Sequence, residues 1–314
     1  MQRRTLLLGL VGMGASGCMA TDPRIQGRAE PMYSPSPPVQ MSGAVAMADL
    51  EGAAASLLAA MAAAPWAGSD AARFTLLAGI HRTHHGVLAS TDPLRREPVP
   101  VEALAVTPPA DRASAIASAT SVLTRLKDSH EALATQTTGV TAAFWASQAA
   151  AAVQAVSALT APVTTLTKSV PLRQVATASP AAAGEALLSR YHEAAYGLES
   201  CLGRLSAGHP SRAGLSAVAS TTKAQRDALV ARSRAASQTP VPGAAAYSIP
   251  TTTSDDQALA LAARLLASIT GAAAVVVASA EAVSATAVLD LESASTLGLS
   301  LGMGLADYPG WPDA

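Results

Sequence analysis

The chain has 314 residues, of which 50% are hydrophobic, 3% are aromatic and 14% are charged, and its formal net charge is −1. A near-neutral chain lacks the clustered lysines and arginines of a nucleic-acid-binding domain, so we exclude nucleic acid as a partner. The apolar residues are mostly alanine, leucine and valine, which favours helices and predicts an all-α protein of one large or two modest domains.

The N-terminal segment has the features of an export signal. Arg3 and Arg4 precede an apolar stretch from Leu6 to Ala15, which is much shorter than the roughly 20 residues that span a bilayer. The small residues Ala-Ser-Gly then precede Cys18, a pattern that resembles the lipobox of bacterial lipoproteins. Residues 1–18 are therefore predicted to be a twin-arginine lipoprotein signal peptide, cleaved before a lipid-modified Cys18. The alternative is an ordinary secretory signal whose cysteine is incidental.

This prediction places the mature protein on the extracytoplasmic face of the cell membrane, held there by its lipid anchor. Residues 19–42 are polar and rich in proline, which predicts a tether between the membrane and the folded part of the chain. The other cysteine, Cys201, lies in an apolar helical pattern and is predicted to be buried and inert.

Periodic patterns of small and apolar residues, with capping residues such as Asp111, predict helices in the first half of the chain. These helices form an N-terminal helical bundle over residues 43–160, and their predicted ranges are 43–64, 69–90, 111–136 and 140–159. Residues 161–178 are predicted to be a linker.

The predicted second domain covers residues 179–314 and consists of a helical bundle with a C-terminal tail. Ser179 precedes a proline, which is a favourable arrangement for an N-cap and the first helical position. The second helix of this domain carries Thr222 and Gln225 in the middle of its apolar stripe. We place the break between the last two helices at residues 281–284.

Two apolar stretches raise the question of a membrane-spanning helix. Residues 132–167 carry no charge, but glutamine, serine and threonine interrupt them, and such side chains are costly at membrane depth. Residues 265–280 are short and lie between Arg264 and Glu281. Both stretches are predicted to be helices buried in a soluble core.

Four short motifs in the second half resemble a known family. They are Tyr191-His192-Glu193-Ala194-Ala195-Tyr196-Gly197, Gln225-Arg226-Asp227-Ala228-Leu229, Tyr247-Ser248-Ile249-Pro250 and Tyr308-Pro309-Gly310-Trp311-Pro312. Their order and spacing are similar to those of an uncharacterised ferritin-like domain family, found in predicted lipoproteins of high-GC Gram-positive bacteria. The resemblance covers about residues 178–312. It implies a C-terminal ferritin-like four-helix bundle, which the helical bundle predicted over residues 43–160 precedes, and it implies no activity.

The ferritin-like resemblance raises the question of a di-iron site. Such a site needs a Glu from each of two helices and a Glu-x-x-His pair from each of the other two. None of the six histidines has a glutamate three residues before it. Tyr191, Thr222 and Gln225 occupy the positions where the resemblance would lead us to expect ligands. We therefore expect no di-iron chemistry.

One group of histidines is a candidate metal site. His81, His84 and His85 lie on one predicted helix, and His81 and His85 can share a face because they are four residues apart. His130 or Glu131 would supply a third ligand from a neighbouring helix, so the candidate ligands are His81, His85 and His130. The alternative is that these histidines are solvated or interact with carbonyls at the helix end.

No catalytic motif is recognisable, because the Ser-x-x-Lys match at Ser220 lacks its companion motifs and the expected sheet. We therefore favour a membrane-anchored binding or structural lipoprotein without a cofactor, whose partner is an envelope protein, a lipid or a small apolar ligand. The alternative is a metal-binding or redox protein that uses the histidine cluster. A degenerate enzyme also stays open, with no indication of its substrate.

Overall fold

The structure is a computed structural model that describes residues 41–95, 98–102, 104–161, 165–167 and 178–311. The predicted signal peptide, its lipid-modified Cys18 and all but the last two residues of the predicted tether lie outside the described residues. The predicted linker at 161–178 also falls largely outside them, so the division into two domains stays a prediction.

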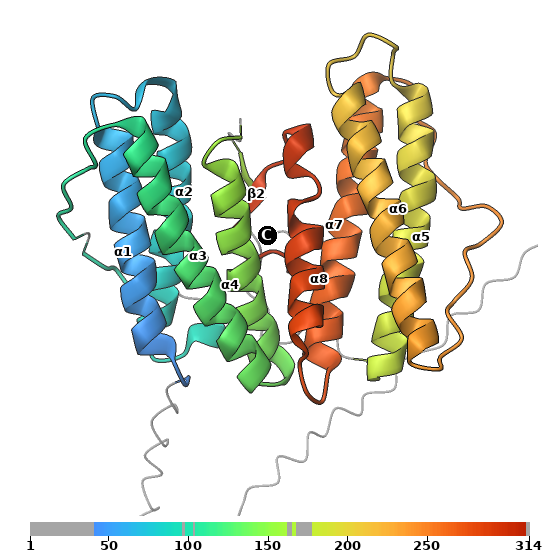
Figure 1. Ribbon diagram of the computed structural model, residues 1–314, viewed down its shortest axis with the longest axis horizontal. Coiled ribbons are helices and arrows are strands. Elements are labelled where there is room, and N and C mark those ends of the chain that lie inside the picture. Colours follow the sequence, from blue (N-terminus) through green and yellow to red (C-terminus); the bar gives the residue numbers. More distant parts are fainter. Residues whose placement is uncertain (1–40, 96–97, 103, 162–164, 168–177, 312–314) are drawn as a thin grey trace, which may run out of the picture. The chain divides into compact units, whose positions relative to one another are not determined.

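Most of the described chain lies in eight α-helices, which confirms the all-α fold (Figure 1). The first four helices lie close to their predicted ranges. Asp111 caps the third of them, since its side chain accepts a hydrogen bond from the Ser114 amide. These helices are α1 (Ala44–Ala63), α2 (Ala71–Leu88), α3 (Arg112–Gln136) and α4 (Gly139–Ala158).

Three of the second four helices begin after a serine N-cap. Ser179, Ser254 and Ser284 each accept a hydrogen bond from the amide three residues ahead, which satisfies an otherwise unpaired helix-end donor. The predicted break at 281–284 is confirmed. The helices are α5 (Pro180–Arg204), α6 (Arg212–Ala235), α7 (Asp255–Ser279) and α8 (Ala285–Thr296).

Short elements complete the described structure. The 3-10 helices are η1 (Gly68–Asp70), η2 (Pro93–Arg95) and η3 (Leu299–Leu301). Strands β1 (Leu166–Thr167) and β2 (Leu305–Ala306) form one parallel pair. This pair attaches the segment after α8 to the segment after α4.

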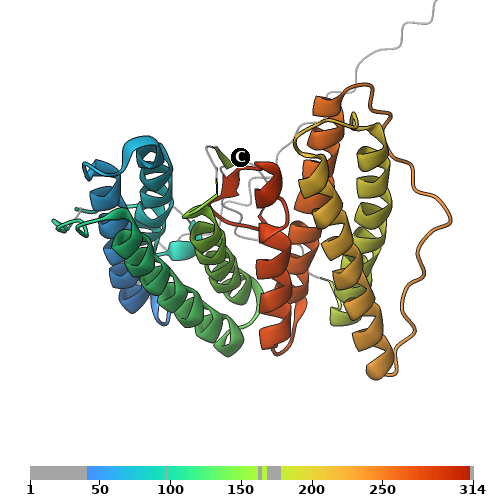
Figure 2. The same cartoon turned by 45° about the horizontal axis from the view of Figure 1, so that its top comes forward.

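Helix α4 connects the two groups of helices. It packs against α3 on one side and against α7 and α8 on the other (Figures 1 and 2). Phe144 and Trp145 at its centre are fully buried, and one hydrophobic cluster continues from them into α5, α7 and α8. The uncharged stretch from residue 132 therefore includes a helix that is buried among other helices, as predicted.

Two other helices, α1 and α7, are long and apolar enough to cross a membrane by length and composition. Both pack against neighbouring helices, α1 against α2 and α3, and α7 against α4, α5 and α8. A core helix of a soluble protein has the same length and composition, so these features give only weak evidence of a span.

Candidate metal centre

A buried carboxylate lies inside the first group of helices. Glu51 belongs to the apolar stripe of α1, in register with the buried residues Ala44, Met47 and Leu58. This register turns its side chain toward α2 and α3, and its exposed fraction is 0%. A charge in such a position is strongly destabilising unless it is paired.

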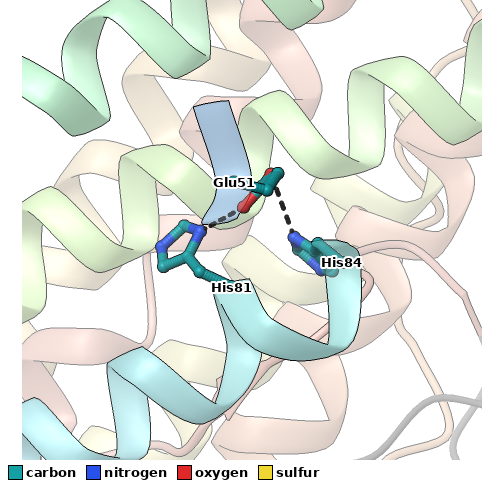
Figure 3. A group of neighbouring side chains, drawn as sticks. All are labelled: Glu51, His81 and His84. Atoms are coloured by element: carbon teal, nitrogen blue, oxygen red, sulfur yellow. Dashed lines mark hydrogen bonds and ion pairs between the residues drawn. The ribbon is translucent and has the colours of Figure 1, made fainter. Parts of the chain in front are cut away.

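Three histidines pair with this carboxylate, and all three are fully buried. His81 and His84 come from α2, and His130 comes from α3. The Nδ1 atom of His81 lies 2.6 Å from Glu51 Oε2, and the Nδ1 atom of His84 lies 3.3 Å from Oε1 (Figure 3). The Nε2 atom of His130 lies 3.0 Å from Oε1. One carboxylate therefore accepts from three imidazoles.

The hydrogen bonds of His84 define its protonation state. Its Nε2 atom lies 2.7 Å from the Asp307 carbonyl oxygen, which can only accept, so Nε2 carries a hydrogen. Nδ1 then needs a second hydrogen to donate to Glu51, and His84 is an imidazolium. Burial alone would lower the pKa of His84, but the charge of Glu51 and the Asp307 carbonyl raise it.

The Glu51 carboxylate is correspondingly ionised. Burial, the largest single effect, raises its pKa, but the charges of His81 and His84 and the hydrogen bonds from His130 and His81 outweigh it. The pKa of Glu51 is therefore held well below its ordinary value. Glu51 and His84 together form a buried ion pair.

His130 has the opposite character. Burial and the neighbouring His84 and His81 lower its pKa, against the opposing effect of Glu51. Its Nε2 atom faces Glu51 and donates the hydrogen bond to the carboxylate. Trp145 of α4 stacks on this ring, with the centroids 5.5 Å apart and the planes 25° apart.

Several buried polar atoms around the cluster have no hydrogen-bond partner among the described residues. They are His81 Nε2, His130 Nδ1 and the Nε1 atom of Trp145, which stacks on His130. Leaving such an atom unpaired costs roughly 1–3 kcal/mol. Buried polar atoms are paired in most native proteins, and unpaired ones often indicate an ordered water or an ion. The interior of this bundle thus has unused capacity to bind a ligand.

The cluster fits a metal ion by distance and by chemistry. One ligand atom from each of Glu51, His81 and His84 lies within 4.8 Å of the others. Imidazole nitrogens with a carboxylate oxygen suit zinc, iron, manganese or copper. Binding would require the hydrogens shared between the rings and the carboxylate to leave, because an ion coordinates the lone pairs that now hold them.

The structure brings together only some of the predicted ligands. His81 and His130 both contact Glu51, but His85 does not. A Cβ atom added at Gly52 would lie 2.9 Å from its ring, which places His85 beside α1 and away from the carboxylate. Glu131 instead pairs with Lys127 at 2.9 Å.

Sequence reasoning missed Glu51 and gave His84 no ligand role. The alternative that the histidines of this helix are solvated is wrong for His81 and His84, which are fully buried. The available signal was a single acidic residue on the buried stripe of an alanine-rich helix. His84 lies three residues and His85 four residues after His81, so both lie near the helix face that carries His81. The rotation of α2 about its axis determines which of the two points at Glu51.

The segment after β2 packs beside His84. Besides the Asp307 carbonyl, the ring of Tyr308 lies 4.9 Å from the His84 ring. Ser147 of α4 donates a hydrogen bond to the Pro309 carbonyl at 2.9 Å. The C-terminal motif that begins at Tyr308 therefore contacts the first group of helices.

Other candidate residues have ordinary structural roles. Tyr191 donates a hydrogen bond to Gln225 at 3.0 Å, and Thr222 donates to the Val218 carbonyl at 2.8 Å. Cys201 is buried as predicted, and burial raises the pKa of its thiol.

The Ser-x-x-Lys match also has no catalytic geometry. Ser220 donates to the Ser216 carbonyl, and Lys223 pairs with Glu199 of α5. The serine and the lysine are therefore engaged with different partners.

Comparison with known proteins identifies one match. No curated protein and no solved structure matches the chain. Residues 182–313 match the family model described as "Domain of unknown function (DUF4439)". This supports the coarser part of the resemblance, an uncharacterised domain family in the second half. The match excludes Glu51, His81, His84 and His130 but includes Asp307 and Tyr308, so the segment similar to this family contacts His84 of the candidate metal centre.

Proposed function

We propose that this protein binds one transition-metal ion through Glu51, His81, His84 and His130. The observation that carries the proposal is the fully buried carboxylate with three buried imidazoles, each of which directs one ring nitrogen at it. Four-helix carboxylate proteins hold their metals in the same way, with inward ligands that include a pair three residues apart on one helix. His81 and His84 form such a pair on α2. A single carboxylate favours one ion over two.

The residues around the cluster have defined tasks in this proposal. The Asp307 carbonyl keeps the hydrogen of His84 on Nε2 and so directs Nδ1 toward the ion position. Trp145 packs on His130, and Phe144 packs against Trp145 and Tyr308, so aromatic side chains cover one side of the ligands. Stacking on Trp145 also fixes the orientation of the His130 ring. When bound, the ion would supply Lewis acidity or one-electron chemistry, according to the metal.

We further propose that the protein acts as a lipoprotein on the extracytoplasmic face of the cell membrane. Support comes from the paired arginines, the short apolar stretch and the lipobox-like sequence before Cys18. A ferritin-like fold remains part of the proposal and is supported by the resemblance of residues 178–312.

Titration of the metal-free protein with Co²⁺, Mn²⁺ and Zn²⁺ tests the metal proposal. We expect saturable binding of one ion per chain, which His81→Gln and His84→Gln weaken by at least about tenfold. His85→Gln is the matched control, since this residue lies on the same helix outside the cluster, and it should bind as the unaltered chain does. Circular dichroism establishes that each variant is folded. No binding by the folded unaltered chain, or equal loss in the His85 variant, would refute the proposal.

A further inference from the structure

A second site lies away from the histidine cluster. A cavity of about 490 Å³ is bounded by α4, α7, α8 and the segment that follows α8. Its volume lies within the range of small-molecule binding sites, roughly 300–1,000 Å³. Protein interiors are otherwise close-packed, and unfilled apolar space is destabilising. A ligand that fills the cavity would therefore stabilise the folded protein.

Small residues on one face of α7 create this space. Ala263, Ala267 and Gly271 line the cavity at helical spacing, and Ala294 and Gly298 line it after them in the chain. Glycine is unfavourable in the interior of a helix. A Cβ atom added at Gly271 would meet nothing within 4 Å, so a larger side chain would extend into open space.

The polar side chains of the wall are already engaged with the protein. The Gln154 amide donates to the Ser295 carbonyl at 2.7 Å and accepts from the Ala306 amide at 3.1 Å. Thr270 donates to the Leu266 carbonyl at 3.2 Å, and the Ser295 hydroxyl donates to the Glu292 carbonyl. The interior that remains is mostly apolar, with Leu266 and Trp311 among its buried walls.

One charge lies at this cavity. Arg264 is the single charged residue among the described lining residues, and it is exposed. It forms no ion pair with any other residue that the structure describes. Ala267, one turn further along α7, is also exposed, so Arg264 and Ala267 lie at the opening of the cavity to solvent. An arginine at the entrance of an apolar cavity is complementary to a ligand with an apolar chain and an anionic head.

We propose that this cavity binds an anionic amphiphile, with its acyl chain between α7 and α8 and its carboxylate or phosphate on Arg264. The same chemistry occurs in a free fatty acid and in an anionic phospholipid. This proposal is independent of the metal site, because none of the four metal ligands lines the cavity.

Binding of dodecanoate to the full mature chain tests the proposal, measured by titration calorimetry below the micellar concentration. We expect saturable binding of one molecule. Dodecanol and dodecyltrimethylammonium, with the same chain and a neutral or cationic head, should bind at least about tenfold more weakly. A dodecanoate brominated near its end should quench Trp311, and Trp311→Phe should remove that part of the quenching.

Variants distinguish the contribution of the ligand's acyl chain from that of its anionic head. Gly271→Leu fills the cavity and should abolish binding, with Ala267→Leu as a second filling variant. Arg264→Gln should reduce dodecanoate affinity by about tenfold and leave dodecanol unchanged. Arg234→Gln is the control, since it removes an exposed arginine of α6 outside the cavity.

A second arm distinguishes the two sources of the ligand. The protein is incubated with phosphatidylglycerol vesicles and re-isolated, and retained lipid is identified by mass spectrometry. Retention that Gly271→Leu abolishes identifies a membrane lipid, and binding of dodecanoate alone identifies a free fatty acid. Absence of binding in both arms, or binding that is insensitive to Gly271→Leu, would overturn the proposal.

Discussion

At the scale of single residues, the dominant feature is a carboxylate that cannot be buried alone. Glu51 is tolerated because His81, His84 and His130 each direct a ring nitrogen at it. The pair of Glu51 and His84 is neutral overall, so the buried carboxylate of the cluster has a counter-charge without a metal ion. One imidazolium is enough to neutralise a single carboxylate, but three imidazoles surround Glu51. The two additional imidazoles favour a role in binding a metal over a purely structural role.

Removing this carboxylate should be costly even in the metal-free protein. We expect Glu51→Gln to lower the free energy of unfolding by about 3–5 kcal/mol, because it leaves a buried imidazolium without its counter-ion. Asp49→Asn is the matched control on the exposed face of α1 and should change stability by less than about 0.5 kcal/mol. Urea denaturation of both variants measures the difference, and equal effects would show that Glu51 is not energetically coupled to the histidines.

A second buried carboxylate gives a pH dependence. Burial, together with the neighbouring Glu131, raises the pKa of Glu292 on α8 from 4.5 to about 8. The folded chain therefore binds this proton more tightly than the unfolded chain. The stabilisation is fully present below pH 4.5 and is lost as the pH rises through about 8.

We accordingly expect the unaltered protein to lose stability relative to Glu292→Gln across that interval. Denaturant titrations at several pH values between 4.5 and 9 measure the difference in unfolding free energy. The exposed Glu185→Gln variant should show a difference that does not vary in this way. A pH-independent difference for Glu292→Gln would contradict the expected proton linkage.

At the scale of elements, the sequence predicted helices well and their rotations poorly. The all-α fold followed from composition, and the helix starts at Asp111 and Ser179 followed from capping chemistry, which is local. The choice between His84 and His85 depended on how α2 is turned toward α1. That rotation comes from packing between helices, and a single sequence does not specify it.

The C-terminal segment shows the same limit. Its motif from Tyr308 was recognisable in the sequence, but its contact with His84, more than 200 positions earlier, was not. Local patterns contain no information on which distant carbonyl a histidine meets. The family match to residues 182–313 likewise does not include the four proposed ligands, so the resemblance could not indicate a metal centre in the first half of the chain.

Docking of the C-terminal segment should influence the metal centre. Gly310 has a φ of +87°, and a Cβ there would lie 2.6 Å from the Ala274 Cβ. Gly302 has a similar φ of +76° with nothing within 4 Å. Both alanine variants share the backbone penalty of about 1–2 kcal/mol, but only Gly310→Ala displaces the segment from α7.

We therefore expect Gly310→Ala to lower Co²⁺ affinity by roughly tenfold, because it disturbs the Asp307 carbonyl that orients His84. Gly302→Ala should leave the affinity unchanged. Titration of both variants with Co²⁺ gives the comparison, and equal affinities would show that the segment does not support the ligand.

At the scale of the whole molecule, α4 joins the two groups of helices through a shared hydrophobic cluster. A core that continues across both groups favours one cooperative unfolding transition over two. We expect calorimetry of residues 41–314 to give a single transition with matching calorimetric and van't Hoff enthalpies. Two resolved transitions would instead support the division at 161–178 that the sequence predicts.

Elemental analysis of the protein purified from its native envelope without chelator tests the central claim most directly. We predict close to one transition-metal ion per chain, retained in His85→Gln and lost in the His81→Gln, His84→Gln double variant. A folded protein without metal, which also takes up none when supplied with iron, manganese, zinc or cobalt, would contradict it and leave the cluster as a buried ion pair.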